Sequence, residues 1–188
     1  MRKLKLQIHM SIDGFVAGPN GESDWMLRSS DGLQIVNSLI DSSDTILMGR
    51  KMTDGFVNYW ENIVNNQPES PEFTFAKKMV DTLKVVFSET LDKSTWTNTV
   101  LAKGNLTDEI VNLKNQNGKD LLVYGGADFA GSLIKENLID EYYLFVQPVI
   151  LGKGMTIFDK TENRLNLKLV ESKSFESGVV LLHYAPRR

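Results

Sequence analysis

The chain has 188 residues, carries 21 Lys and Arg against 24 Asp and Glu, and contains no cysteine. The missing cysteine excludes disulfides, a thiolate nucleophile and cysteine-ligated metal centres, and two histidines, His9 and His183, leave little for a histidine metal site. A formal charge of −3 argues against a dedicated nucleic-acid-binding protein, which normally has a basic excess. We therefore predict neither a metal site nor a nucleic-acid partner.

The length of the chain suits one hydrophobic core, so a single domain spanning residues 1–188 is expected. No apolar run approaches the roughly 18 residues that a membrane span needs, and the first residues lack the apolar core of a secretory signal. The sequence therefore predicts a cytoplasmic protein without a membrane partner.

Strand and helix patterns alternate along the chain. Leu4, Leu6, Ile8 and Met10 alternate with polar residues, which predicts a strand with one buried face. Apolar positions at helical spacing predict a first helix over 33–40. Further strands are predicted at 45–48, 84–87, 100–102, 121–124, 142–147, 167–172 and 179–184, and further helices at 73–83, 107–117 and 127–136. Thr107 is the predicted cap of the helix that it begins.

This order predicts an α/β fold with three layers. Strands that alternate with helices favour a mostly parallel sheet with helices on both faces, and the two closing strands favour an antiparallel hairpin. No repeat or long linker divides the chain.

Glycine follows two of the buried strands. Gly125 and Gly126 stand between a strand and a helix, where the helix N-terminus offers free N–H groups to a phosphate. Gly49 ends another strand and is followed by Arg50 and Lys51, cations that can bind phosphate. Tight turns and solvated side chains are the alternative interpretations. Together, these strand ends favour a ligand that has more than one phosphate.

A hydroxyl group and a long loop are two weaker candidates for parts of a binding site. Ser88 follows a third strand and either donates to a phosphate or caps a turn. The glycine-rich segment 10–25 ends at Trp25 and has the composition of a lid over a site, although inert loops share it.

Taken together, these segments resemble the family that joins dihydrofolate reductases to the reductase domain of the bifunctional riboflavin-biosynthesis deaminase-reductase. The resemblance covers almost the whole chain and favours the riboflavin branch and its small stand-alone relatives. The matching segments are Ser11–Ala17 with Trp25, Met48–Lys51, Val86–Ser88, Leu122–Gly126, Leu138–Tyr142, and Pro148–Gly154 with Phe158.

The resemblance implies a dihydrofolate-reductase-like fold and NADPH as hydride donor. It places the adenosine 2′-phosphate and neighbouring phosphates near Gly49, Arg50, Lys51 and Ser88, with Thr53 as a shifted hydroxyl. It also implies a pyrophosphate site lined by Gly125, Gly126, Ala127 and Asp128, and a nicotinamide flanked by Ala17 and Gly18.

On the substrate side, the resemblance implies contacts from Trp25 and Tyr124, the latter standing where the riboflavin branch often has an acidic residue. The proton relay is assigned to Asp31, Asp13 or ordered water. We expect a small heterocyclic substrate, an aminopyrimidine of the riboflavin pathway, because of the Pro148–Gly154 signature. The alternatives are a dihydrofolate or pterin reductase and a non-catalytic NADP-binding protein. The C-terminal strands are expected to form a homodimer interface, as in relatives of this branch.

Overall fold

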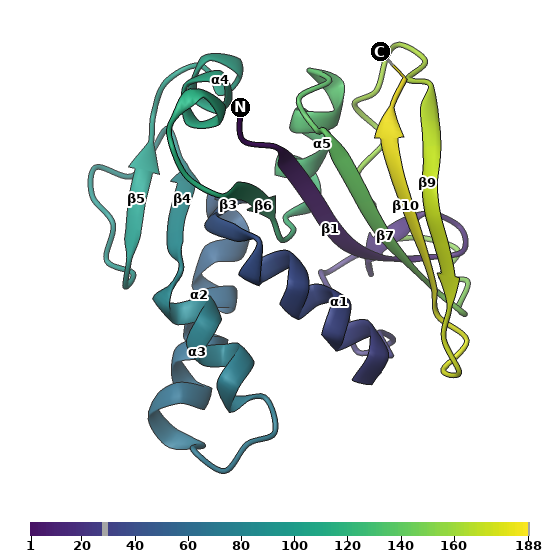
Figure 1. Cartoon of the computed structure of the whole chain (residues 1–188), viewed down its shortest axis with the longest axis horizontal. Coiled ribbons are helices and arrows are strands. Elements are labelled where there is room, and N and C mark those ends of the chain that lie inside the picture. Colours follow the sequence, from purple (N-terminus) through teal and green to yellow (C-terminus); the bar gives the residue numbers. More distant parts are fainter. Residues whose placement is uncertain (28–29, 188) are drawn as a thin grey trace.

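The computed structural model describes residues 1–27 and 30–187, and its centre is one eight-stranded sheet (Figure 1). The strand order is β5-β4-β3-β6-β1-β7-β10-β9. Neighbouring strands pair parallel, except that β10 pairs antiparallel with both β7 and β9. The strands are β1 (Leu4–Ser11), β3 (Ser43–Gly49), β4 (Leu83–Phe87), β5 (Thr99–Ala102), β6 (Asp120–Val123), β7 (Glu141–Gln147), β9 (Leu167–Ser174) and β10 (Val180–Pro186).

Helices cover both faces of this sheet, which confirms the predicted three-layer α/β fold. On one face, α4 (Leu106–Asn115) and α5 (Ala127–Lys135) pack on a core that includes Leu4 and Leu6 of β1. On the other face, α1 (Ser30–Asp41), α2 (Arg50–Asn66) and α3 (Phe73–Asp81) share a second core with Ile46 and Met48 of β3. Within the described residues, none of the helices combines the length and apolar character that a membrane crossing needs.

Several predicted elements change in the structure. The helix α2 was missing from the predicted order because its buried side, Thr53, Val57, Trp60 and Ile63, mixes polar and aromatic residues with aliphatic ones. Asn105, rather than Thr107, caps α4, because its side chain accepts hydrogen bonds from the N–H groups of Thr107 and Asp108. The same helix ends at Asn115, two residues earlier than the predicted 117.

A small second sheet was also not predicted. It pairs β2 (Phe15–Ala17) with β8 (Met155–Thr156) and so fastens the glycine-rich loop to the body of the protein. A side chain at Gly154 would collide with the Ala17 carbonyl, only 2.2 Å from the Cβ position. The close approach of these segments therefore requires glycine there.

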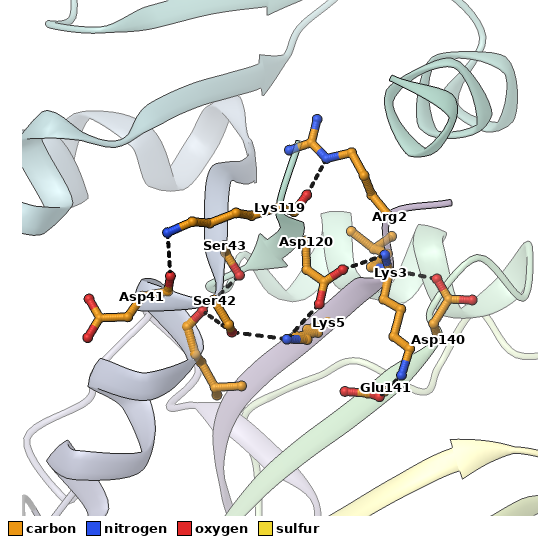
Figure 2. Close-up of polar contacts among 12 residues, drawn as sticks. Arg2, Lys3, Lys5, Asp41, Ser42, Ser43, Lys119, Asp120, Asp140 and Glu141 are labelled. Atoms are coloured by element: carbon orange, nitrogen blue, oxygen red, sulfur yellow. Dashed lines mark hydrogen bonds and ion pairs between the residues drawn. The ribbon is translucent and has the colours of Figure 1, made fainter. Parts of the chain in front are cut away.

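The amino ends of the central strands are tied together by charged side chains (Figure 2). The Asp120 carboxylate accepts from the Lys3 N–H at 2.9 Å and pairs with Lys5 Nζ at 2.8 Å. Asp140 accepts from the Leu4 N–H at 2.8 Å, and Lys3 Nζ lies 2.6 Å from Glu141. These contacts join β1 to both of its neighbours, β6 and β7.

Replacing Asp120 with asparagine is expected to lower stability at neutral pH by about 1–2 kcal/mol, since charge-assisted hydrogen bonds are lost. Burial acts to raise the pKa of Asp120, but the hydrogen bonds from Lys5 and Lys3 outweigh it, so this pKa lies below its ordinary value of 3.8. The stabilisation is therefore present above about pH 4 and disappears as the pH falls through the folded-state pKa. Urea unfolding across this range should show that the free energies of unfolding of the wild-type protein and Asp120→Asn become equal in acid.

Asp24→Asn, at an exposed loop carboxylate, is the control. A difference in stability between wild type and Asp120→Asn that stays unchanged in acid would contradict the stabilising role of the Asp120 carboxylate.

Candidate functional site

A cleft of about 1660 Å³ opens at the carboxyl ends of the parallel strands. Gly49, Phe87 and Ala102 lie in register on β3, β4 and β5, and all three line the cleft. The chain leaves each strand at the same level, so the residues that follow gather at one edge of the sheet. Ligands of open α/β sheets bind at this edge.

Two helix N-termini meet at this cleft without a capping side chain. The N-caps of α2 and α5 are Gly49 and Gly126, and neither helix receives a side-chain hydrogen bond at its N-cap. A Cβ atom at Gly126 would lie 3.8 Å from the Gly49 nitrogen, so the two N-termini are adjacent. In contrast, Asn105 caps α4. Adjacent N-termini without caps can bind an anion through their free N–H groups and aligned dipoles.

The glycines at these N-termini are required by their backbone conformation or close packing. Gly125 and Gly126 have φ of 141° and 87°, values that favour glycine. At Gly49, a Cβ atom would lie 2.8 Å from the Phe129 Cβ, so β3 could not approach α5 as closely with any other residue. The backbone is therefore exposed to a ligand at this point of the cleft.

Positive charge surrounds the same two N-termini. Arg50 and Lys51 are exposed, line the cleft, and form no ion pair with any residue that the structure describes. Asp128 in the first turn of α5 pairs with Lys160 at 2.5 Å. The hydrogen bond from Lys160 lowers the pKa of Asp128, so this carboxylate is ionised and its charge is offset. Arg50 and Lys51 therefore give this end of the cleft a positive character.

Ser88 lines the cleft directly after β4, and its side chain also shapes the local turn. Its hydroxyl oxygen accepts from the N–H groups of Thr90 at 3.3 Å and Leu91 at 3.2 Å. A hydroxyl that accepts in this way keeps its own O–H for donation. The turn interpretation and the phosphate interpretation are therefore compatible.

The structure brings most of the predicted residues to this cleft. The predicted residues that line it are Ala17, Gly49, Arg50, Lys51, Ser88, Tyr124, Gly125, Gly126, Ala127 and Asp128. Their individual roles stay predictions.

Three predicted residues lie outside the cleft lining. Thr53 is fully buried and donates its hydroxyl proton to the Gly49 carbonyl at 3.1 Å, so it is a helix-packing residue and not a ligand for phosphate. The Gly18 N–H donates to the Glu22 carbonyl. The same carbonyl accepts from the Trp25 indole at 3.0 Å, which holds that ring within the loop.

The two carboxylates predicted for proton transfer also lie outside the cleft lining. Asp13 accepts from the N–H groups of Leu151 and Gly152 at 3.1 and 2.7 Å and thus joins two loops. A hydrogen bond with the Ser11 hydroxyl lowers the pKa of Asp13, which makes it a poor proton donor near neutral pH. Asp31 is exposed in the first turn of α1, although the next residue, Gly32, lines the cleft. Neither position supports the predicted relay.

Apart from Tyr124, sequence reasoning missed the other half of the cleft, which lies between β1, β7 and α2. Here Phe56 and Tyr124 pack edge to face with ring centroids 5.3 Å apart, and Trp60 lies beside Phe56. Gln7 and His9 of β1 also line this half. The spacing of Phe56 and Trp60, four residues apart, was a helical signal that could have revealed α2 and this aromatic wall.

The sequence profile of the RibD C-terminal domain matches residues 2–181. The chain belongs to this family. Membership confirms the resemblance drawn from the strand-end motifs.

Similar proteins match almost the whole chain. The uncharacterized protein YyaP of Bacillus subtilis (strain 168) is 34% identical over 183 residues, which are 97% of this chain and 94% of YyaP. A candidate riboflavin biosynthesis protein of Shewanella sp. PV-4 superposes with a TM-score of 0.79 at 24% identity, and all of each chain is covered. A bifunctional deaminase and 5-amino-6-(5-phosphoribosylamino)uracil reductase of Thermotoga maritima superposes with a TM-score of 0.68 at 17% identity, over 99% of this chain and 57% of that one. These solved structures share the RibD-type fold.

Proposed function

We propose that this RibD-type domain is an NADPH-dependent reductase that transfers a hydride to a small planar heterocycle, an aminopyrimidine like that of the riboflavin pathway. The observation that carries the proposal is the pair of uncapped helix N-termini beside Arg50 and Lys51, at the carboxyl edge of the sheet. A dinucleotide has the several phosphates that such a site can bind.

The residues of the cleft fit this cofactor. The turn at Gly125 and Gly126 would hold the pyrophosphate against α5, and Arg50, Lys51 and Ser88 would hold the 2′-phosphate and its neighbours. When bound, NADPH supplies the hydride, and the protein orients two rings and excludes water. The aromatic half of the cleft would receive the heterocycle.

Two other functions compete with this one. A dihydrofolate or pterin reductase would use the same cofactor half, and the wall formed by Phe56 and Tyr124 would also accept a pterin ring. A non-catalytic NADP-binding protein is supported by Asp13 and Asp31, which both lie outside the cleft lining.

A cofactor titration followed by a turnover assay tests the proposal. We expect saturable NADPH binding and NADPH oxidation with an aminopyrimidine, monitored by loss of nicotinamide absorbance. Oxidation with dihydrofolate alone would favour the pterin reductase, and binding without oxidation of either substrate would favour the non-catalytic protein. Absence of NADPH binding would refute all three.

Arg50→Ala is expected to weaken NADPH binding by about 10- to 100-fold and NADH binding by less than about threefold, since one charge-assisted phosphate contact is lost. The guanidinium would contact the 2′-phosphate, which NADH lacks. Dissociation constants from fluorescence titration measure the difference. Lys153→Ala, at an exposed cation absent from the cleft lining, is the control. Equal losses for both cofactors would place Arg50 at another phosphate.

We also propose that the chain forms a homodimer through β9. This edge strand has eight residues, and Leu169 and Val170 on it are 49% and 53% exposed. A long edge strand with exposed apolar side chains invites pairing with another chain.

Val170→Lys is therefore expected to convert a dimer into a monomer, because an ammonium group would be buried in the interface. Light scattering coupled to gel filtration measures the mass. Val100→Lys is a matched control, since Val100 is 50% exposed on β5, the opposite edge of the sheet. A wild-type monomer, or a dimer broken only by Val100→Lys, would contradict this interface.

A further inference from the structure

Gln7 lies where strand β1 passes the end of its neighbour β6. The pairing of these two strands ends at Leu6, which lies opposite Val123, the last residue of β6. Gln7 is therefore the first residue of β1 beyond this pairing. Leu6 and Ile8 belong to the core under α4 and α5, so the alternation along the strand turns the Gln7 side chain toward the opposite face. There it lines the aromatic half of the cleft.

The amide group of Gln7 is buried without being satisfied. The residue is only 1% exposed, and its Nε2 atom has no hydrogen-bond partner among the residues that the structure describes. Of the two amide atoms, Oε1 keeps accessible surface at the cleft and Nε2 does not. A buried polar group without a partner lowers the stability of a protein, and a ligand can restore the missing interaction. The Gln7 oxygen is therefore the atom that a ligand can reach.

The chemistry of this oxygen determines which ligand group it can bind. An amide oxygen only accepts hydrogen bonds, so the ligand must present a donor. An exocyclic amino group projects beyond its ring and can reach a recessed oxygen while the ring packs on the wall formed by Phe56 and Tyr124. A ligand carbonyl in the same place would bring two acceptors together, and a methyl group would leave the Gln7 oxygen without a partner. The site therefore favours a ligand that carries an amino group.

We propose that Gln7 determines substrate specificity by accepting, through Oε1, a hydrogen bond from an exocyclic amino group of a planar heterocycle. This inference rests on the proposed function, because it names a recognition contact in the half of the same cleft that would receive the heterocycle. The Gln7 amide carries no charge, so the contact selects a neutral amino group and not a cation. Aminopyrimidines and pterins both carry such a group, and the contact holds for either class of substrate.

Two pyrimidines of nearly equal shape test this contact, 6-aminouracil and 6-methyluracil. With NADP⁺ bound, the wild-type protein should bind 6-aminouracil about 10-fold more tightly in calorimetric titration, as expected for one hydrogen bond to a buried acceptor. Gln7→Met removes the oxygen and should reduce this preference below about twofold, whereas Gln7→Glu keeps an acceptor and should retain most of it. Gln34→Met, at an exposed glutamine of α1, is the matched control. Equal affinity of the wild-type protein for both uracils, or a full preference in Gln7→Met, would overturn the proposal.

The stability of the ligand-free protein provides a separate readout. Gln7→Met should raise the midpoint of thermal unfolding by about 2–4 °C, because an apolar side chain replaces an unsatisfied buried amide. Gln34→Met should change it by less than about 1 °C. A lower midpoint for Gln7→Met would show that the amide serves the fold, and would also overturn the proposal. Absence of NADPH binding by the wild-type protein would refute the proposed function, whereas a preference for 6-aminouracil without cofactor would still support the role of Gln7.

Discussion

Lys84→Met is expected to lower the free energy of unfolding by about 3 kcal/mol, because buried carbonyl groups lose their hydrogen-bond donor. Lys84 lies on β4, is 1% exposed, and donates from Nζ to the carbonyls of Met79, Val80 and Thr82 at 3.0, 2.9 and 2.8 Å. These carbonyls end α3, so the ammonium completes the helix C-terminus and joins it to the sheet. A methionine fills similar volume without donating.

The pH dependence tests whether the Lys84 amine is buried in the folded protein. Burial lowers the pKa of Lys84 from 10.5 to about 8. The unfolded chain therefore binds more protons than the folded chain between these values, and the wild-type protein should gain stability relative to Lys84→Met as the pH rises through this interval. Urea unfolding at neutral and alkaline pH measures the difference in free energy of unfolding between the wild-type protein and Lys84→Met. Lys77→Met, at a 60% exposed side chain in α3, the helix whose end Lys84 contacts, should cost less than about 0.5 kcal/mol. Equal effects at both lysines would contradict the assignment.

The fold could be predicted from the sequence because its main signals are local. Period-two alternation at Leu4–Met10 and continuous apolar runs such as 45–48 identify strands without knowledge of their partners. The structure confirms the alternating order and the closing hairpin of β9 and β10. The short strands β2 and β8 lacked a local signal, since three and two residues define no period.

The glycine-rich half of the cleft, where we propose that the cofactor binds, was also accessible to sequence reasoning. Gly49, Gly125 and Gly126 follow buried strands, and parallel strands bring their carboxyl ends to one edge. Glycine after a buried strand therefore predicts both a tight turn and its position at the carboxyl edge of the sheet. The same reasoning misplaced Thr53, because the direction of its side chain depends on a helix that the pattern did not reveal.

The aromatic half of the cleft, where we propose that the heterocycle binds, was not predictable apart from Tyr124, since it depends on contacts between distant segments. Gln147 lies 138 residues from His9 and 120 residues from Leu27, and only strand pairing between β1 and β7 brings them together. Gln7 looked like an ordinary polar position of an alternating strand. In the structure its side chain is only 1% exposed, which the local pattern does not reveal. These contacts between distant segments cannot be read from a local sequence pattern.

Gly126→Ala is expected to weaken NADPH binding by about 100-fold, equivalent to about 2.7 kcal/mol, while the protein stays folded. An added Cβ atom would lie 3.7 Å from the Phe129 Cβ and 3.8 Å from the Gly49 nitrogen, which are ordinary contacts. The methyl group would nevertheless stand between the N-termini of α2 and α5, where the pyrophosphate would bind. Fluorescence titration gives the dissociation constant, and thermal unfolding gives the stability.

Gly14→Ala separates backbone strain from loss of the binding site. Gly14 has φ of 88°, almost equal to the 87° of Gly126, and a Cβ atom there would meet nothing within 4 Å. Both variants should therefore lose about 1–2 kcal/mol of stability, the cost of a left-handed conformation for alanine. Only Gly126→Ala should lose NADPH affinity, because Gly14 is absent from the cleft lining. Equal NADPH affinities of the two variants would exclude the turn at Gly126 as the pyrophosphate site.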